Sequence, residues 1–406
     1  MPYFFSPKVL FGSGMLKRFG SEIEGRGTKA VIITGKTMVK FAQPLNEAVK
    51  AAGYEVYIWD GTTHEPTIDL VVKAANVLKE QNPQLILAYG GGSVIDAAKA
   101  AWVLYERPEM TGTDLVAINP RSKLNLRKKA RFVAIPTTSG TGSDATWAIV
   151  VTDTANHRKI GFANAEILPD ITLLVPEFTT GMPKKLTAST GMDVLGHAID
   201  GLTARQQTDF SDGMCLQAMK LTFEWLPKAC ADGNDLTARS KMQNAATIAG
   251  LGFGNSNTSL SHALGHAIGS VFDLPHGRSI GVALTYSIDF IATNPPIANA
   301  PNPLVQLGLA ASFAGINADS DEDAAKKIVA KIKELQKEID EPLCLKDLGV
   351  TEDRMQQKLD NLVALAVKDV NMYSSPCECK EEHLKQLFID IWQGNKKTRA
   401  RAKTAK

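Results

Sequence analysis

Short apolar runs alternate with amphipathic helical patterns along the first 180 residues. The apolar runs predict strands at 29–35, 54–60, 85–92, 132–138, 146–153, 159–164 and 171–176. Apolar residues at helical spacing predict helices at 37–53, 67–81 and 93–105. Strands separated by helices of this length are joined by right-handed crossovers, so we expect a Rossmann-like parallel sheet. The last three runs are also compatible with antiparallel pairing.

The pattern changes at Thr180-Gly181-Met182-Pro183. Long helical patterns follow and strand signals almost disappear. A chain of 406 residues is also too long for one hydrophobic core. We therefore predict an α/β nucleotide-binding domain at 1–180 and an all-helical domain at 181–406. A ligand site between the two is expected.

Composition narrows the possible partners. Hydrophobic residues make up 44% and charged residues 22% of the chain, with a net charge of +2, so nothing points to nucleic acid or membrane. There is no 18-residue apolar run and no pattern of a signal peptide. Five cysteines, an odd number, favour a reducing cytoplasm. The basic end 396–406 is expected to be a disordered tail.

Two loops have the composition of phosphate-binding turns. Gly90-Gly91-Gly92-Ser93 lies between a predicted strand and a helix, and the loop 136–143 is rich in glycine and hydroxyl groups. Glycines let a phosphate approach the backbone, and a helix N-terminus offers free N–H groups. Alternatively, Ser93 simply caps the helix after a tight turn. Because both loops follow parallel strands, nucleotide binding is the favoured interpretation.

Histidines and one carboxylate form the most informative pattern. Asp193 and His197 are four residues apart on a predicted helix, as are His262 and His266, while His276 follows a proline and is expected in a loop. Satisfied core imidazoles are the alternative. This set of ligands suits one divalent ion such as Zn²⁺ or Fe²⁺. Spacing alone does not show which histidine is left for chemistry.

Five segments resemble the iron-containing (group III) alcohol dehydrogenase family over nearly the whole chain. They are FGSG (11–14), GGGSVIDAAKA (90–100), IPTTSGTGSDAT (135–146), TGMDVLGHAIDG (190–201) and SHALGHAIGSVFDLPHG (261–277). The resemblance implies a dehydroquinate synthase-like superfold and an NAD- or NADP-binding domain. It implies four metal ligands, Asp193, His197, His262 and His276, and leaves His266 beside the metal as the catalytic candidate for proton transfer.

The resemblance also implies cofactor and substrate contacts. The positions expected at the cofactor are Gly35, Lys36, Gly91, Gly92, Ser93, Asp96, Thr137, Thr138, Thr146 and Lys159. The positions expected at the substrate pocket are Trp147, Phe253 and Thr258, which suggests an apolar pocket for a medium-sized, cyclic or aromatic alcohol. Many relatives have an Asp where this chain has Gly35, followed by Lys36, so NADP is expected to be tolerated. The Asn-Pro-Arg segment of many relatives is replaced near 372–380.

The expected function is reversible hydride transfer between an alcohol and its aldehyde or ketone, in a cytoplasmic homodimer or larger homo-oligomer. One alternative is an NAD-using lyase or cyclase of the dehydroquinate synthase type. Such an enzyme needs several basic residues for a substrate phosphate, and only Arg278 lies near the metal motifs. Another alternative is a non-catalytic, filament-forming relative.

Overall fold

A six-stranded parallel sheet forms the first part of the molecule. The computed structural model describes residues 3–63, 66–154 and 158–394, and the side chains of 158 and 159 are not described. The sheet has the order β1-β8-β5-β4-β2-β3, and every pairing in it is parallel. Its strands are β1 (Lys8–Phe11), β2 (Lys29–Gly35), β3 (Glu55–Thr62), β4 (Leu85–Gly90), β5 (Arg131–Pro136) and β8 (Ile171–Leu174). β6 (Ala148–Asp153) and β7 (Arg158–Ala163) form a separate antiparallel hairpin.

Helices cover both faces of this sheet. Val31 and Ile33 of β2 pack with α3 (Ile68–Gln81) and α4 (Gly92–Glu106), while Ile32 packs on the opposite face with α1 (Leu16–Ile23) and α2 (Gln43–Ala51). Because both faces are covered, the strands read as continuous apolar runs. The predicted α/β class with a parallel sheet is therefore confirmed.

Two details of this region differ from the prediction. The helix predicted at 37–53 is instead a 3₁₀ turn, η1 (Val39–Phe41), followed by α2. Pro44 sits in the first turn of α2 and has no N–H for a hydrogen bond to a preceding turn, so the helix begins there. Strand β1 and helix α1 were not predicted, because the four residues of β1 are too few for a periodic signal.

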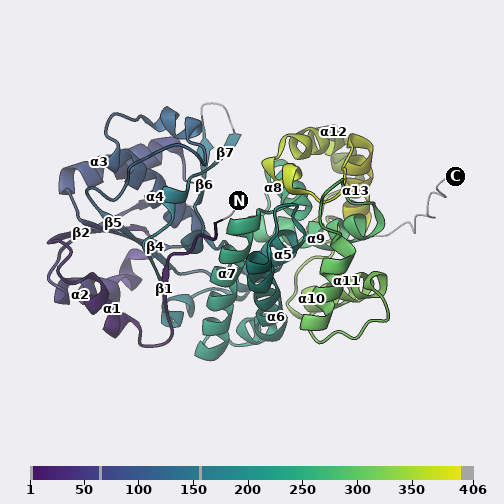
Figure 1. The fold of residues 1–406 in the computed structure, drawn as a ribbon, viewed down its shortest axis with the longest axis horizontal. Helices are drawn as coiled ribbons and strands as arrows, with labels where there is room; N and C mark the ends of the chain where they lie inside the picture. The colour runs from purple at the N-terminus through teal and green to yellow at the C-terminus, as the bar shows by residue number, and fades with distance from the viewer. Residues whose placement is uncertain (1–2, 64–65, 155–157, 395–406) are drawn as a thin grey trace.

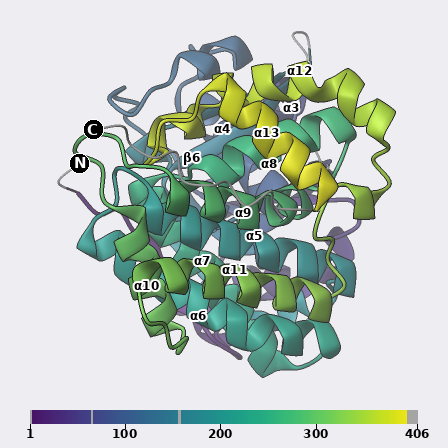
Figure 2. The same ribbon diagram turned by 90° about the vertical axis from the view of Figure 1, so that its right-hand side faces the viewer.

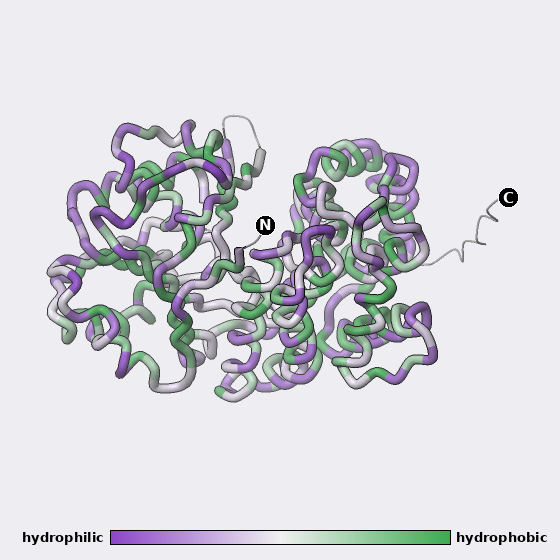
Figure 3. The backbone as a smooth tube through the Cα atoms, in the orientation of Figure 1, coloured by the Kyte–Doolittle hydropathy of each residue, from purple (hydrophilic) through white to green (hydrophobic). Residues whose placement is uncertain are grey.

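After β8 ends at residue 174, the described part of the chain forms helices and no further strand (Figures 1 and 2). The α-helices are α5 (Lys184–Thr203), α6 (Asp209–Ala231), α7 (Leu236–Ser256), α8 (Leu260–Phe272), α9 (His276–Thr293), α10 (Pro303–Phe313), α11 (Asp321–Glu338), α12 (Glu352–Lys368) and α13 (Glu381–Gln393). They share one hydrophobic core. Hydrophobic and hydrophilic stretches alternate along their outer members (Figure 3), as one-sided burial requires. None of the described helices is long and apolar enough to span a membrane. The tail 396–406 lies outside the described residues.

The loop after β5 joins the sheet to the helices. Gly142 in this loop has φ +62°, and a Cβ there would lie 2.7 Å from the Cα of Gly250 on α7. Gln243 of α7 also donates a hydrogen bond to the carbonyl of Pro136, at 3.0 Å. The carboxyl end of β5 is thus fixed directly against the helical region. The glycine-rich loops at this end of the sheet therefore lie on the side that faces the helices.

Candidate metal centre and cofactor loops

Three helices bring the predicted metal ligands together. Asp193 and His197 lie one turn apart on α5, His262 lies on α8, and His276 is the first residue of α9. One ligand atom from each of the four lies within 4.8 Å of the others. The loop position predicted for His276 was wrong, because Pro275 takes the N-cap position and the helix starts directly after it.

Burial of the cluster is uneven. The side chains of Asp193 and His262 are each 3% exposed, and that of His197 is 6% exposed. The side chain of His276 is 43% exposed, and that of His266 is 40% exposed. The cluster is therefore enclosed by protein except on the side where His276 and His266 lie, and a small molecule would have to approach from there.

Three atoms of the cluster are buried but make no hydrogen bond within the described part of the chain, which is typical of metal ligands and not of polar atoms in a protein core. Among the described residues, Asp193 Oδ1, His197 Nδ1 and His262 Nε2 are buried without a hydrogen-bond partner. Such atoms are costly unless something else satisfies them. One carboxylate oxygen and three imidazole nitrogens converging on one point fit a single divalent cation. The residues present therefore fit the ion that the sequence motifs imply.

Asp200 holds one of these ligands in place. Its Oδ2 accepts a hydrogen bond from His262 Nδ1 at 2.8 Å, and it also accepts backbone N–H groups of Ser259 and His262. The bond to Nδ1 leaves Nε2 of the ring to face Asp193. Sequence reasoning missed Asp200, although it lies three residues after His197 on the same face of α5.

Charge in the centre follows from burial and proximity. Burial raises the pKa of Asp193, but the neighbouring rings of His197, His276 and His262 outweigh it, so its pKa falls below the usual range. Burial lowers the pKa of His197 to about 3, although Asp193 acts in the opposite direction. At neutral pH the site therefore combines an anionic carboxylate with a neutral His197, the protonation states that bind metal.

Small residues allow the three helices to approach. A Cβ on Gly277 of α9 would lie 2.1 Å from the carbonyl oxygen of Ser189 on α5, and 3.1 Å from Cβ of Asp193. Ile280 of α9 fills the space beside Gly196 and Gly265 in the same way. The glycines among these motifs thus serve helix packing, which sets the distances between the ligands.

His266 stands beside the four-residue cluster. Its ring centre lies 5.2 Å from that of His276 and 6.0 Å from that of His262. Its Nδ1 is 2.8 Å from Oδ2 of Asp369, in the segment before the 3₁₀ helix η7 (Val370–Ser374). Asn371 lies 3.4 Å from the same nitrogen. Sequence reasoning missed Asp369 and Asn371, which are more than 100 positions away along the chain.

The glycine-rich turn lies at the start of α4, against the second predicted loop. Gly91 is the N-cap of α4, and Ser93 is already the second residue of the helix. The alternative in which Ser93 is the N-cap was therefore wrong. A Cβ on Gly91 would lie 3.3 Å from the Thr138 side chain, and one on Gly92 would lie 2.7 Å from that of Thr141. The two predicted loops thus touch each other at the ends of adjacent strands β4 and β5, where open parallel sheets bind ligands.

Gly35 ends strand β2, which pairs with the edge of β4 that faces away from β5. It is buried, and Lys36 beside it is exposed. Thr137 and Thr146 are also buried, at 4% and 3% exposure. The side chain of Lys159 lies outside what the structure describes. The contacts of all these residues with a cofactor remain predictions.

Asp96 and Lys99 serve the protein's own loop. Asp96 accepts hydrogen bonds from the Ser143 hydroxyl and, at 2.9 Å, from the backbone N–H of Val150. Lys99 donates to the carbonyl oxygens of Ser143 and Thr146, at 2.5 and 2.7 Å. Both side chains therefore hold the loop 143–150, and the predicted contact of Asp96 with the cofactor stays a prediction.

Of the three predicted pocket residues, Phe253 has a direct contact with the cluster. The ring of Phe253 stacks on that of His197, with centres 4.1 Å apart. Trp147 donates its indole N–H to the carbonyl of Gly254, at 2.5 Å. Thr258 donates its hydroxyl to Oδ1 of Asn371, at 2.6 Å. Trp147 is thus joined to the residue after Phe253, and Thr258 to a neighbour of His266, while the contacts of all three with a substrate stay predictions.

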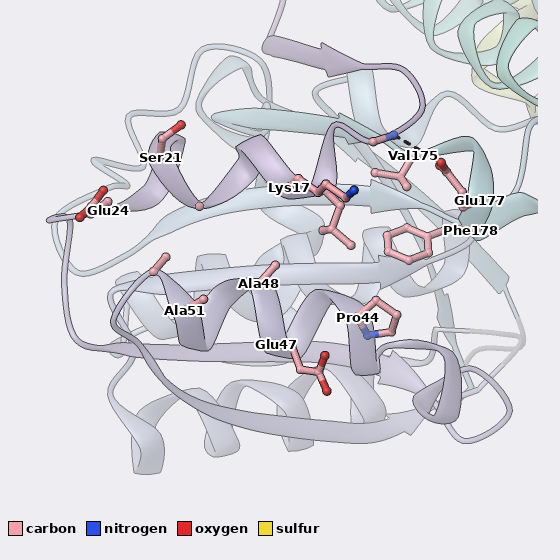
Figure 4. Close-up of a pocket in the computed structure, with 14 residues that line it drawn as sticks. Lys17, Ser21, Glu24, Pro44, Glu47, Ala48, Ala51, Val175, Glu177 and Phe178 are labelled. Atoms are coloured by element: carbon pink, nitrogen blue, oxygen red, sulfur yellow. Dashed lines mark hydrogen bonds between the residues drawn. The ribbon is translucent and has the colours of Figure 1, made fainter.

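Two other features do not belong to the site. Arg278 forms a two-fold ion pair with Glu341, at 2.7 and 3.1 Å, so its guanidinium is already engaged. A hollow of about 770 Å³ lies between α1 and α2 and is lined by residues such as Pro44, Ala48 and Phe178 (Figure 4). It contains none of the residues predicted for metal or cofactor.

Comparisons with known proteins agree with this arrangement. Residues 6–176 match the family model of iron-containing alcohol dehydrogenases, and residues 187–392 match the model of that family's C-terminal part. The chain is 33% identical over 389 residues to an NADPH-dependent butanol dehydrogenase of Clostridium saccharobutylicum, covering 95% of this chain and 96% of that one. It is 32% identical to the bifunctional aldehyde-alcohol dehydrogenase of Escherichia coli K12, of which it spans 46%.

Among solved structures, a 1,3-propanediol oxidoreductase superposes with a TM-score of 0.87 at 28% identity. The superposition covers 97% of this chain and all of the other.

Proposed function

This chain belongs to the iron-containing alcohol dehydrogenase family and is a metal-dependent, NAD(P)-linked alcohol dehydrogenase, and we propose that it interconverts small primary alcohols and their aldehydes. The observation that carries the proposal is the converging group of one carboxylate and three imidazoles, of which all but His276 are buried. The name of one relative refers to butanol, and that of one solved structure to 1,3-propanediol, whose hydroxyl groups are both primary. The aromatic rings of Trp147 and Phe253 suit the carbon chain of such substrates.

Asp193, His197, His262 and His276 would hold one divalent ion, Fe²⁺ in the cell or Zn²⁺. When bound, such an ion supplies a Lewis acid that lowers the pKa of an alcohol, and NAD(P) supplies the hydride acceptor. Asp200 keeps the His262 ring oriented through its bond to Nδ1. Protein encloses the cluster except on the side of His276 and His266, so substrate and water would both reach it from that side.

His266 is the proposed catalytic residue for proton movement. It lies next to the cluster but outside the group of converging ligands, and its side chain is 40% exposed. It can therefore accept the hydroxyl proton of an alcohol and pass it to solvent, and return it in aldehyde reduction.

For the cofactor, the proposal is that the turn at Gly91–Ser93 and the loop 137–146 hold the pyrophosphate side, and that NADP is accepted because Gly35 has no carboxylate to repel a 2′-phosphate. Cytoplasmic location and a homodimer or larger homo-oligomer complete the proposal. All five cysteines are free thiols, which agrees with a reducing compartment.

The test combines metal content with turnover. The purified enzyme should oxidise alcohols of a panel from 1-propanol to benzyl alcohol with net reduction of NAD or NADP, followed by absorbance. His262→Ala should lose most of its metal and activity, whereas His383→Ala, a histidine on α13, should lose neither. Full metal occupancy in His262→Ala would contradict the assignment. Product formation without net cofactor consumption would favour the lyase or cyclase alternative, which the pairing of Arg278 with Glu341 does not support.

A further inference from the structure

A chain of hydrogen bonds runs from Thr258 to His266. The Thr258 hydroxyl donates to Oδ1 of Asn371, at 2.6 Å. The amide nitrogen of Asn371 donates to Oδ1 of Asp369, at 2.7 Å. The other oxygen of Asp369 lies 2.8 Å from Nδ1 of His266. These bonds connect the link between α7 and α8, and α8 itself, to the start of η7, which is more than 100 positions away in sequence.

This chain of bonds determines which nitrogen of His266 carries the proton. An ionised carboxylate can only accept hydrogen bonds, so Nδ1 must be the donor. Burial raises the pKa of Asp369, but its hydrogen bonds to His266 and Asn371 outweigh that effect and lower the pKa, so the carboxylate is ionised at neutral pH. In the neutral ring the proton is then on Nδ1, and Nε2 has the lone pair.

We propose that Asp369 is a positioning residue that fixes the His266 ring with Nε2 available to receive the substrate proton. The proposal rests on the proposed function, in which His266 moves that proton. A half-exposed ring on a helix surface has several accessible rotamers, and without a partner it would spend only part of its time in the reactive one. Asp369 is well placed for this task, since its own side chain is only 15% exposed.

A purely structural role for Asp369 must be separated from this one. Asp369 is also the N-cap of η7, where its side chain accepts the backbone N–H of Asn371 at 2.9 Å. Asn is as good an N-cap as Asp, so Asp369→Asn keeps the cap. The amide of Asn can instead donate to Nδ1, which would move the proton of the ring to Nε2 and remove the lone pair from the reacting side.

The experiment compares four variants by kcat, by KM for NAD(P) and by metal content. Asp369→Asn should lower kcat by about 100-fold while the KM for NAD(P) and the metal content stay at wild-type values; a loss of this size is typical of a missing general base. His266→Ala should lose a similar factor, and the double variant should lose no more than His266→Ala alone. Asp360→Asn, an Asp on α12 that is 88% exposed, should behave as wild type.

Each other outcome overturns the inference. Wild-type kcat in Asp369→Asn would show that the carboxylate does not position the ring. Multiplicative losses in the double variant would show that Asp369 acts independently of His266, and loss of metal would show that it supports the metal centre instead. If the wild-type enzyme itself turns over no alcohol with either cofactor, the proposed function fails, and the inference fails with it. An active wild type with an active Asp369→Asn removes the inference alone.

Discussion

Replacing Lys99 with Met should release the loop that carries Thr146 and Trp147. Lys99 lies on α4 and is completely buried. Its ammonium group donates to the carbonyl oxygens of Ser143, Thr146 and Ala148, at 2.5, 2.7 and 3.3 Å. A Met side chain is similar in length and fills the same volume, but it offers no donor, so all three carbonyls would lose this partner.

The expected loss of stability is the difference between two opposing effects. Three hydrogen bonds from a charged donor, at about 1.5–3 kcal/mol each, give roughly 4–6 kcal/mol with the longest one counted as weak. Burial lowers the pKa of Lys99 from 10.5 to about 8, although Asp96 and Asp144 act against it. That shift corresponds to roughly 3 kcal/mol spent on keeping the buried amine charged. The variant should therefore be less stable by about 1–3 kcal/mol at pH 7.

The pH dependence gives a second, independent check. Below pH 8 the amine is protonated in both the folded and the unfolded chain. Between pH 8 and 10.5 the folded protein has released a proton that the unfolded chain still binds, so the contribution of Lys99 to stability rises with pH. Urea unfolding followed by circular dichroism at pH 7 and pH 9.5 should show a gap between wild type and Lys99→Met that widens at the higher pH.

The control is Lys73→Met, which changes an exposed lysine of α3. It should leave both stability and the KM for NAD(P) unchanged, whereas Lys99→Met should raise that KM because the loop loses its anchor. The reasoning is refuted if Lys99→Met unfolds at the same urea concentration as Lys73→Met, or if the gap to wild type narrows as the pH rises.

Three further predictions use other parts of the structure. Gly277→Ala should cost about 1–3 kcal/mol and reduce bound metal, because the new Cβ would lie 2.1 Å from a carbonyl oxygen of α5; Gly213→Ala, where nothing lies within 4 Å, is the control, and equal metal content in both would contradict this view of the helix contact. Gly35→Asp should reduce kcat/KM for NADP more than for NAD, with Gly35→Asn as the uncharged control, and an unchanged ratio would argue against a role for this position. Burial, and then Asp209, raises the pKa of Asp212 to about 7, so its contribution to stability is lost as the pH rises from about 4 to about 7. Asp212→Asn should therefore be more stable than wild type by about 1–3 kcal/mol above pH 7 in urea unfolding, and equal stability there would show that the buried carboxylate is not strained.

Local patterns were sufficient where neighbours in space are also neighbours in sequence. Asp193 and His197, four residues apart, were correctly placed on one helix, because helical spacing alone puts such pairs on one face. The strand at 29–35 was predicted with its observed bounds, since burial on both faces produces an unbroken apolar run. His276 was misplaced because Pro275 and Gly277 on either side of it were interpreted as loop residues, although proline is also frequent at the start of a helix.

The residues that sequence reasoning missed act across long distances in the chain. Asp200 contacts His262 across 62 positions, and Asp369 contacts His266 across 103. Periodicity describes which way a side chain points from its own helix, but not which other helix it meets. Asp96 has a role that its position after the glycine-rich turn does not reveal: its oxygens accept hydrogen bonds from Ser143 and Val150, while its predicted contact with the cofactor stays a prediction.

The metal centre and the loop after β5 share one feature: in each, a buried charged side chain fixes the position of a neighbouring residue through hydrogen bonds. Asp200 fixes His262 and Lys99 fixes the loop 143–148, and neither faces the open side of the centre. Each buried charge is expensive on its own, so it is stable only because several hydrogen bonds converge on it. The loop that Lys99 holds also contacts α7 through Gly142. A shift of that loop would therefore move Thr146 and Trp147, which are predicted to contact cofactor and substrate, relative to the helices that carry the predicted metal ligands, so we expect Lys99 to affect turnover through the position of this loop.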